Sequence, residues 1–464
     1  MQQQDRDRRA ERAADLVPGL SEQGVQAVAV TSVDLAGITR TKGFPLDRLP
    51  EVAAWGVGTS VVFDTYGTDD LAVPVPAAAG PVGGAVGDLR LHPDTDRLIR
   101  LPATPGWAWA PADRYAQDGS PHPLDTRLLL AATVADLAAA GYRARAAVEI
   151  EWVFSSGVDA YGGIVPPTTG NAYGMTRLIE TAEVLGDVLG ALTGAGVRVG
   201  QIHPEYGTGQ FEVSVAAEDP LGAADTSVLV RATIRAVAAR HGLRVSFAPK
   251  VVVNDVGNGG HIHLSLHAGE TNLMTGGDGA AAMTSAGEGF AAGILAHLPG
   301  LQAIGAPSVA SWLRLQPEQW AGAWAGWGVE NRETALRFVP GVAGDGARAA
   351  NLEVKSFDLA ANPYLSMAAL LVAGAVGVRD RLRLPPAVDV DPARLSEQQR
   401  ADAEVHPLPA DLGAAADALA GDDVLADGLG RSLAATLVAH RRAEVERFAG
   451  MDAHAIVAAT RWVW

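Results

Sequence analysis

The chain has 464 residues, of which 48% are apolar and 19% are charged, and its formal net charge is −17. It contains no cysteine, which excludes a disulfide scaffold, a thiolate zinc site and a cysteine nucleophile. The negative charge disfavours nucleic acids and anionic membranes as partners, and the absence of a signal peptide or a long apolar run predicts a soluble cytoplasmic protein.

The first quarter of the sequence is typical of short strands joined by loops. Residues 1–14 are polar and predict a flexible N-terminus. Residues 26–41 alternate apolar and polar side chains, which predicts two strands and a hairpin, and a short strand is expected at 89–91. The Pro- and Gly-containing stretch 101–123 predicts a loop, so we place a boundary near residue 120, between a small β-rich domain (15–120) and the rest.

The remainder of the chain, residues 121–464, mixes strands and helices. Helices are expected at 124–141, 175–193, 223–241, 284–297 and 363–379, and strands at 145–154, 209–217, 244–253 and 261–266. An acidic connector at 384–413 interrupts a mostly helical C-terminal part. Because the strands and helices lack the regular βαβ order of a doubly wound sheet, we expect an α+β fold.

Two stretches place pairs of acids close together. In Val148-Glu149-Ile150-Glu151-Trp152, residues two apart on a strand project to the same face, so the two carboxylates need a cation or a proton between them. In the stretch from His203 to Glu212, a Gly-containing turn separates Glu205 from Glu212 and can bring them together. The alternative for both stretches is an ordinary surface strand or hairpin with exposed acids.

Three later stretches carry imidazole and cationic groups. Gly257-Asn258-Gly259-Gly260 leads into a strand with His261, His263 and Ser265 on one face, and imidazole beside carboxylates suits a divalent metal. Asn351-Leu352-Glu353-Val354-Lys355 is another pair of charges two apart, and Glu330–Arg337 carries two arginines of the kind that a transferred phosphoryl group needs. A structural histidine pair and surface salt bridges are the alternatives.

In this order and spacing, the motifs VEIEW, HPEYGTGQFEV, GNGGHIHLSL, ENRETALRFVP and NLEVKSFDLAANPYLSMAALLVAG resemble the glutamine synthetase family, type I branch. The resemblance covers roughly residues 25–380. It implies a small β-grasp-like N-terminal domain and a large catalytic domain, residues 121–464, built on a curved antiparallel sheet with helices. It also implies a homododecamer of two hexameric rings, with active sites shared between subunits.

The resemblance further implies ATP and two to three Mg²⁺ or Mn²⁺ ions as cofactors. The metal ligands carried over are Glu149, Glu151, Glu205, Glu212, His261 and Glu353. Positions matching ATP-binding and phosphate-binding residues are His263, Ser265, Arg337 and Arg348, and Arg332 and Arg337 match the cations that stabilise the transferred phosphoryl group. Positions expected at the glutamate substrate are Gly257, Arg314, Arg332 and Lys355.

The departures from the family concern the nitrogen donor. Family members that use ammonia have a flap glutamate, and counting from Arg314 to Arg332 places Trp320 at that position. The N-terminal aspartate that attracts ammonium is replaced by Thr59 or a neighbour, although Asp64 stays open as an alternative. Trp312, Trp320, Trp324 and Trp327 lie within sixteen residues; some of these rings are expected in the core, whereas Trp320 would form an aromatic wall suited to an amine.

The resemblance therefore predicts a ligase that phosphorylates the γ-carboxylate of glutamate with ATP and joins it to a small amine such as ethanolamine, a polyamine or an alkylamine. Val256, Asn351 and Lys355 differ from the usual family residues and leave the identity of the acid open. The alternatives are an ammonia-using glutamine synthetase and an inactive regulatory or structural relative. Intact metal ligands argue against the latter.

Overall fold

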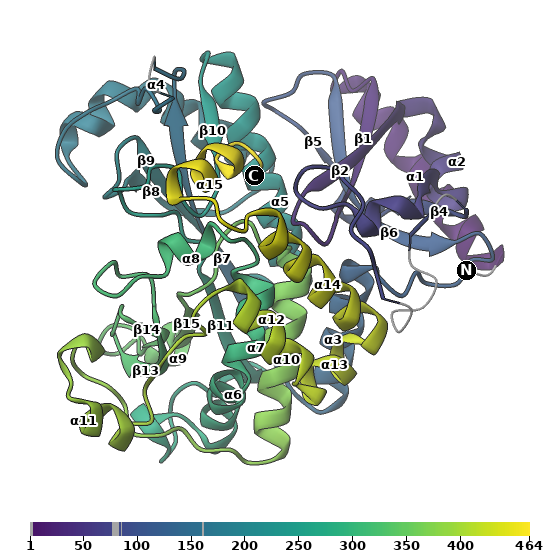
Figure 1. Ribbon diagram of the computed structural model, residues 1–464. Helices are drawn as coiled ribbons and strands as arrows, with labels where there is room; N and C mark the ends of the chain where they lie inside the picture. Colours follow the sequence, from purple (N-terminus) through teal and green to yellow (C-terminus); the bar gives the residue numbers. More distant parts are fainter. Residues whose placement is uncertain (1–2, 77–82, 85, 160–161) are drawn as a thin grey trace.

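Two sheets organise the molecule. The computed structural model describes residues 3–76, 83–84, 86–159 and 162–464. Strands between residues 27 and 116 form the smaller sheet, and strands between residues 143 and 407 form the larger one. Figure 1 shows the smaller sheet in purple and blue at one side, with the larger sheet and most of the helices at the other. The expected α+β class is confirmed.

The smaller sheet has the strand order β2-β1-β6-β4-β3, and β5 pairs with β6. Strands β1 and β6 run parallel, whereas the other pairs are antiparallel. The expected hairpin is present as the pair β1–β2. The strands are β1 (Ala27–Val33), β2 (Thr39–Pro45), β3 (Val57–Ser60), β4 (Asp88–Pro93), β5 (Ile99–Arg100) and β6 (Trp107–Ala116).

The central strand β6 corrects the expected loop at 101–123. Its residues from Ala108 to Arg114 are all buried, so both faces of the strand are covered and the sequence shows no alternation of apolar and polar residues. The Trp109 indole donates a hydrogen bond to the Thr31 hydroxyl on β1 at 2.9 Å, which satisfies its buried N–H.

The N-terminal segment 1–14, expected to be flexible, is helical from Gln3 onward. Helix α1 (Gln3–Glu22) packs against α2 (Leu49–Trp55). Its apolar stripe comprises Ala13, Leu16, Val17 and Leu20, a spacing of three and four residues that places them on one face. The stripe begins only at the end of the polar stretch, so the first fourteen residues alone carry little sign of it.

The larger sheet has the order β16-β13-β14-β15-β11-β7-β9-β8, with β10 on β7 and β12 on β11. Its pairs are antiparallel except for the parallel pair β13–β14. The strands are β7 (Arg143–Ser155), β8 (Val199–Pro204), β9 (Gln210–Val215), β10 (Arg244–Ser246), β11 (Ile262–Ala268), β12 (Thr271–Asn272), β13 (Trp324–Val329), β14 (Thr334–Val339), β15 (Asn351–Val354) and β16 (His406–Pro407).

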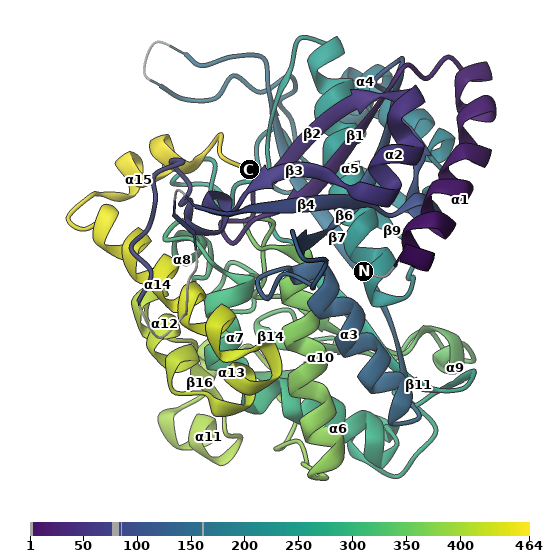
Figure 2. The same cartoon turned by 90° about the vertical axis from the view of Figure 1, so that its right-hand side faces the viewer.

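Helices pack beside this sheet and around the buried helix α10, which contacts α3, α5, α6 and α7 (Figure 2). The helices are α3 (Thr126–Ala139), α4 (Met175–Gly194), α5 (Pro220–Arg240), α6 (Ser285–Ala296), α7 (Leu298–Gly305), α8 (Ser311–Arg314), α9 (Gly346–Ala349), α10 (Pro363–Arg379), α11 (Glu397–Asp402), α12 (Leu412–Ala420), α13 (Asp423–Leu429), α14 (Arg431–Arg447) and α15 (Ala453–Thr460). The five expected helices are present. No helix in the described part of the chain is both long enough and apolar enough to cross a membrane.

Two further regions differ from what the sequence predicted. The strand expected at 244–253 ends at Ser246, because the next backbone N–H, that of Phe247, bonds to the carbonyl oxygen of Trp464 instead of a neighbouring strand. The connector at 384–413 contains helix α11 and strand β16, and β16 pairs with β13 at the edge of the larger sheet.

Candidate active site

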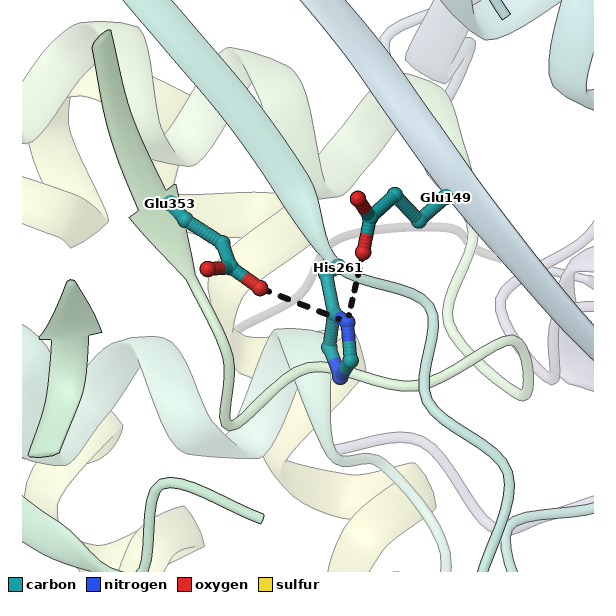
Figure 3. A group of neighbouring side chains, drawn as sticks. All are labelled: Glu149, His261 and Glu353. Atoms are coloured by element: carbon teal, nitrogen blue, oxygen red, sulfur yellow. Dashed lines mark hydrogen bonds and ion pairs between the residues drawn. The ribbon is translucent and has the colours of Figure 1, made fainter. Parts of the chain in front are cut away.

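A first group of metal-ligating side chains joins three neighbouring strands. Glu149 lies on β7, Glu353 on β15, and His261 immediately before β11 (Figure 3). His261 Nδ1 is 3.1 Å from Glu149 Oε2 and 3.4 Å from Glu353 Oε1. One ligand atom from each residue lies within 4.8 Å of the others. The strand order therefore brings together three residues that are far apart in the sequence.

A second group comprises His203, Glu205 and Glu212, which also lie within 4.8 Å of one another through one ligand atom each. The His203 ring is 3.6 Å from Glu205 Oε1 and 3.4 Å from Glu212 Oε1. Glu151, expected as the third ligand here, faces Glu212 across the β7–β9 pair. Its Oε2 accepts hydrogen bonds from Gln210 Nε2 and the Gly259 N–H, both at 2.9 Å.

The second group has an excess of buried negative charge. Burial and the charges of Glu212 and Glu205 raise the pKa of Glu151 to about 8, even though Arg314 lowers it. Burial also raises the pKa of Glu205, and a hydrogen bond to Glu212 raises the pKa of His203 to about 9. Buried like charges that attract protons this strongly fit a divalent cation, which prefers carboxylate oxygens.

The two carboxylates of the first group have lowered pKa values. Burial alone would raise the pKa of Glu149, but hydrogen bonds from His261 and His263 outweigh it and lower that pKa. Burial likewise opposes ionisation of Glu353, and the charges of Lys355 and the histidines lower its pKa to about 2. Lys355 Nζ lies 3.2 Å from Glu353 Oε1. Two carboxylates and an imidazole are a donor set that Mg²⁺ or Mn²⁺ accepts.

Both groups open into one cavity of about 410 Å³. The sequence-predicted residues that line it are Glu149, Glu151, Glu205, Glu212, Gly257, His261, Arg314, Trp320, Arg332 and Lys355. Two predicted residues line neither this cavity nor the second hollow described below: the Glu353 carboxylate accepts a hydrogen bond from Lys355 Nζ, and Arg337 donates to Glu353 Oε2 at 2.9 Å and also pairs with Glu330.

Three of the four residues expected at ATP and its phosphates line a second hollow of about 400 Å³. His263, Ser265 and Arg348 lie there, next to Asn351. Arg348 has an 84% exposed side chain and is bonded to Asp345 at 2.6 Å. His263 touches both sites, because its Nδ1 is 2.8 Å from Asn351 Oδ1 and its Nε2 is 3.2 Å from Glu149 Oε1. The residues expected to bind ATP are therefore separated from those expected to bind metal by the imidazole ring of His263.

Arg314 is held rigidly at the cavity wall. It donates to the carbonyl oxygens of Lys355 at 2.9 Å and Ser356 at 3.3 Å, and lies 3.1 Å from His261 Nε2. Gly257 allows this placement, since a Cβ there would lie 2.3 Å from the Pro249 carbonyl oxygen and 2.7 Å from Arg314 Cγ. Burial lowers the pKa of Arg314.

Sequence reasoning missed three polar residues of this site. The Tyr173 hydroxyl donates to Glu205 Oε2 at 2.7 Å, and its side chain is 56% exposed at the cavity. No sequence pattern links it to Glu205. His203 and Gln210 could have been found, because each precedes a predicted acid by two residues, and alternation on a strand places His203 near Glu205 and Gln210 beside Glu212.

Trp320 and Asp64, the two residues considered for contact with the nitrogen donor, lie in different surroundings. Trp320 is 61% exposed and lines the cavity. Asp64 is buried in its own chain, where it pairs with Arg114 and accepts from His122 Nε2 at 2.7 Å. Since both of its oxygens are engaged within the smaller sheet region, Asp64 is not a free acid for an ammonium ion. Thr59 lines a different hollow.

Comparison with known proteins decides the family. The model of the glutamine synthetase catalytic domain matches residues 123–456. The chain belongs to the glutamine synthetase family. It is 50% identical to the gamma-glutamylpolyamine synthetase GlnA3 of Streptomyces coelicolor, over 97% of this chain and 96% of that protein. The family expected from the sequence motifs is thus confirmed.

Solved structures of this family have the same fold. A crystal structure of a novel glutamine synthase homolog is 34% identical, with a TM-score of 0.83 over 95% of this chain and 99% of the other. A GmaS/ADP complex is 28% identical, with a TM-score of 0.81 over 94% and 96% of the two chains.

Proposed function

We propose that this protein is an ATP-dependent ligase that joins the γ-carboxylate of L-glutamate to a small amine, giving a γ-glutamylamide, ADP and phosphate. The observation that carries the proposal is the single cavity in which two groups of acids, the buried Arg314 and the exposed Trp320 meet. The half-identical relative named as a gamma-glutamylpolyamine synthetase supports the same assignment.

The two acidic groups are proposed to hold two to three Mg²⁺ or Mn²⁺ ions. One site would use Glu149, His261 and Glu353, and the other would use Glu205 and Glu212 with either Glu151 or His203. Bound cations would neutralise these carboxylates and the charge of the phosphate groups. The protein's part is to hold the ligands in place: Gln210 and the Gly259 N–H fix Glu151, and Tyr173 fixes Glu205.

The second hollow is proposed to bind ATP through His263, Ser265 and Arg348. The ADP in the GmaS complex supports a nucleotide in a protein of this fold. From there the terminal phosphoryl group would pass to a γ-carboxylate oxygen of glutamate, leaving ADP. Arg332 at the cavity and Arg337 behind it supply fixed positive charge for the transferred group.

Glutamate would lie in the cavity with its α-carboxylate on Arg314, beside Gly257 and Lys355. In the second step the neutral amine nitrogen attacks the carbonyl carbon of the acyl phosphate, the bond between that carbon and the phosphate oxygen breaks, and the nitrogen proton passes to the released phosphate or to water. Because the two steps form no covalent bond to a protein residue, the protein would accelerate them mostly by positioning the substrates and neutralising their charge.

The acceptor amine is proposed to lie against Trp320. Its indole, together with Tyr206 and Tyr173, gives the cavity mouth aromatic surface that binds alkyl chains by apolar contact and ammonium groups by cation–π attraction. A protonated amine is also attracted by the excess of carboxylates in the cavity. Bare ammonium has no alkyl part and therefore makes no apolar contact with this surface.

We also propose that the chain assembles as a homododecamer of two hexameric rings in the cytoplasm, as its family membership suggests. Light scattering on the purified protein would test this assembly. A mass corresponding to one or two chains would contradict it.

The activity is tested by phosphate release from ATP in the presence of glutamate and one acceptor. The acceptors compared are ammonium, ethanolamine, putrescine and a monoalkylamine. The proposal requires at least one amine to exceed ammonium. Ammonium equal to or above the best amine would instead indicate a glutamine synthetase, and a protein that releases no phosphate with any of the acceptors would be an inactive relative.

A further inference from the structure

The loop of residues 316–322, which carries Trp320, has an unusual backbone. Glu318 has φ 60° and Trp320 has φ 52°, both in the left-handed region that non-glycine residues avoid, and Gly322 follows with φ 69°. A left-handed conformation is unfavourable for a residue with a Cβ. Two such residues in one exposed loop require contacts that hold them there.

Those contacts come from a single buried carboxylate. Glu333 Oε1 accepts a hydrogen bond from the Trp320 N–H at 2.9 Å, and Glu333 Oε2 accepts one from the Glu318 N–H at 3.2 Å. Glu333 is 6% exposed, so the two bonds form in a low-dielectric setting where losing them is costly. Each of the two left-handed non-glycine residues in the loop thus donates its own N–H to Glu333.

Glu333 is itself fixed to the body of the protein. Its N–H donates to Asn331 Oδ1 at 3.0 Å, and Asn331 Nδ2 donates to the carbonyl oxygens of Val388 and Val390, each at 2.9 Å. At the end of the loop, Gly322 packs so closely on Lys355 that a Cβ would lie 2.9 Å from the lysine Cβ. The loop is therefore tied to the sheet beneath the cavity and is not free at the surface.

Glu333 directly follows Arg332, which lines the same cavity as Trp320. The Glu333 side chain holds the loop that carries Trp320, while Arg332 presents a cation to the cavity. A change in the Glu333 contacts would thus move Trp320 relative to Arg332 without touching a metal ligand.

We propose that Glu333 is a positioning residue that fixes Trp320 at the cavity mouth and so sets the preference for an amine over ammonium. The specificity part of this proposal rests on the proposed amine-ligase function. The positioning part depends only on the two hydrogen bonds to the loop.

The test uses the full-length variant Glu333→Gln. The glutamine NH₂ group is a donor, so it cannot accept a hydrogen bond from one of the two backbone N–H groups. Hydrogen–deuterium exchange of the peptide covering 316–322 should be about tenfold faster than in the wild type. The ratio of kcat/KM with amine to kcat/KM with ammonium should fall about fivefold or more, while the KM for ATP stays within about twofold.

The control is Glu288→Gln, which removes another buried carboxylate that bonds to Arg383 and to a backbone N–H, that of Leu384, but does not line the cavity. It should leave exchange in 316–322 and the acceptor ratio unchanged. If Glu333→Gln fails to fold, Glu333→Asp, whose shorter side chain reaches only one N–H, takes its place.

Unchanged exchange in 316–322 would overturn the positioning role. Faster exchange with an unchanged acceptor ratio would overturn the specificity role. A wild type that uses only ammonium would refute the amine-ligase function itself, and the exchange measurement would still decide whether Glu333 holds the loop.

Discussion

Glu151 on β7 lies directly opposite Glu212 on β9, and both side chains are buried. Like charges facing each other across a strand pair destabilise a sheet. With Glu205 also buried in the same cavity wall, the fold places three carboxylates where only a cation or bound protons can relieve the repulsion. This relationship leads to a prediction about stability in the absence of metal.

Above pH 8 in EDTA, Glu151→Gln should be at least as stable as the wild type, because it removes a buried charge that its neighbours repel. The same variant should gain less stability from Mg²⁺ or Mn²⁺, since one candidate ligand is lost. Wild-type binding at a concentration 100 times the Kd contributes about 2.7 kcal/mol. Thermal denaturation with and without metal measures both effects, and an equal metal response in the two proteins would contradict the assignment.

The same groups predict a pH dependence. The folded-state pKa of Glu151 is raised to about 8, and that of His203 is raised to about 9, so the folded protein binds more protons than the unfolded chain between pH 6.5 and 8. Stability in EDTA should therefore fall as the pH rises through this window.

Metal should reverse this trend, because it binds the deprotonated carboxylates. The difference in melting temperature between metal-loaded and metal-free protein should grow from pH 6.5 to pH 9. Burial lowers the pKa of His440 to about 4, so this residue affects the pH dependence of stability only below pH 6.5, outside the range of this experiment. A metal response that is independent of pH would argue against ligands with raised pKa values.

Gly257→Ala should disturb the glutamate side of the cavity. The new Cβ would meet the Pro249 carbonyl oxygen at 2.3 Å and Arg314 at 2.7 Å, so either the backbone or Arg314 must move. We expect a loss of stability of about 1–3 kcal/mol and an increased KM for glutamate. The matched control is Gly186→Ala in helix α4, where nothing lies within 4 Å of the new Cβ. That change should stabilise the helix slightly.

Asp64→Ala tests whether this acid is structural. Its removal leaves the buried Arg114 guanidinium without one of its carboxylate partners, which should cost about 3–5 kcal/mol. The loss would appear as a lower melting temperature. The acceptor preference of the folded enzyme should not change, and a selective loss of ammonium use would assign Asp64 to the acceptor site after all.

The spacing of the acids predicted charged side chains on shared strand faces because strand alternation is local and regular, whereas the full set of candidate metal ligands came from the resemblance to the glutamine synthetase family. Glu149 and Glu151 could be placed on one strand face from their spacing alone. Strand β6 was missed because it is covered on both faces and shows no alternation. Tyr173 and Glu333 were not predicted because their roles depend on tertiary contacts: a bond to Glu205 across 32 residues, and bonds to a loop whose backbone angles no sequence pattern reveals.

Trp320→Glu tests directly whether Trp320 binds the acceptor amine. The indole is 61% exposed at the cavity, so replacing it removes aromatic surface without opening the core. A carboxylate at this position would attract bare ammonium and help to deprotonate it, whereas an alkylamine would lose its apolar and cation–π contacts, worth about 0.5–2 kcal/mol. The ratio of ammonium to amine use should therefore rise, by about tenfold for a change of 1.4 kcal/mol. Trp320→Phe retains an aromatic face and should keep the amine preference; if both variants leave the ratio unchanged, Trp320 does not set acceptor choice.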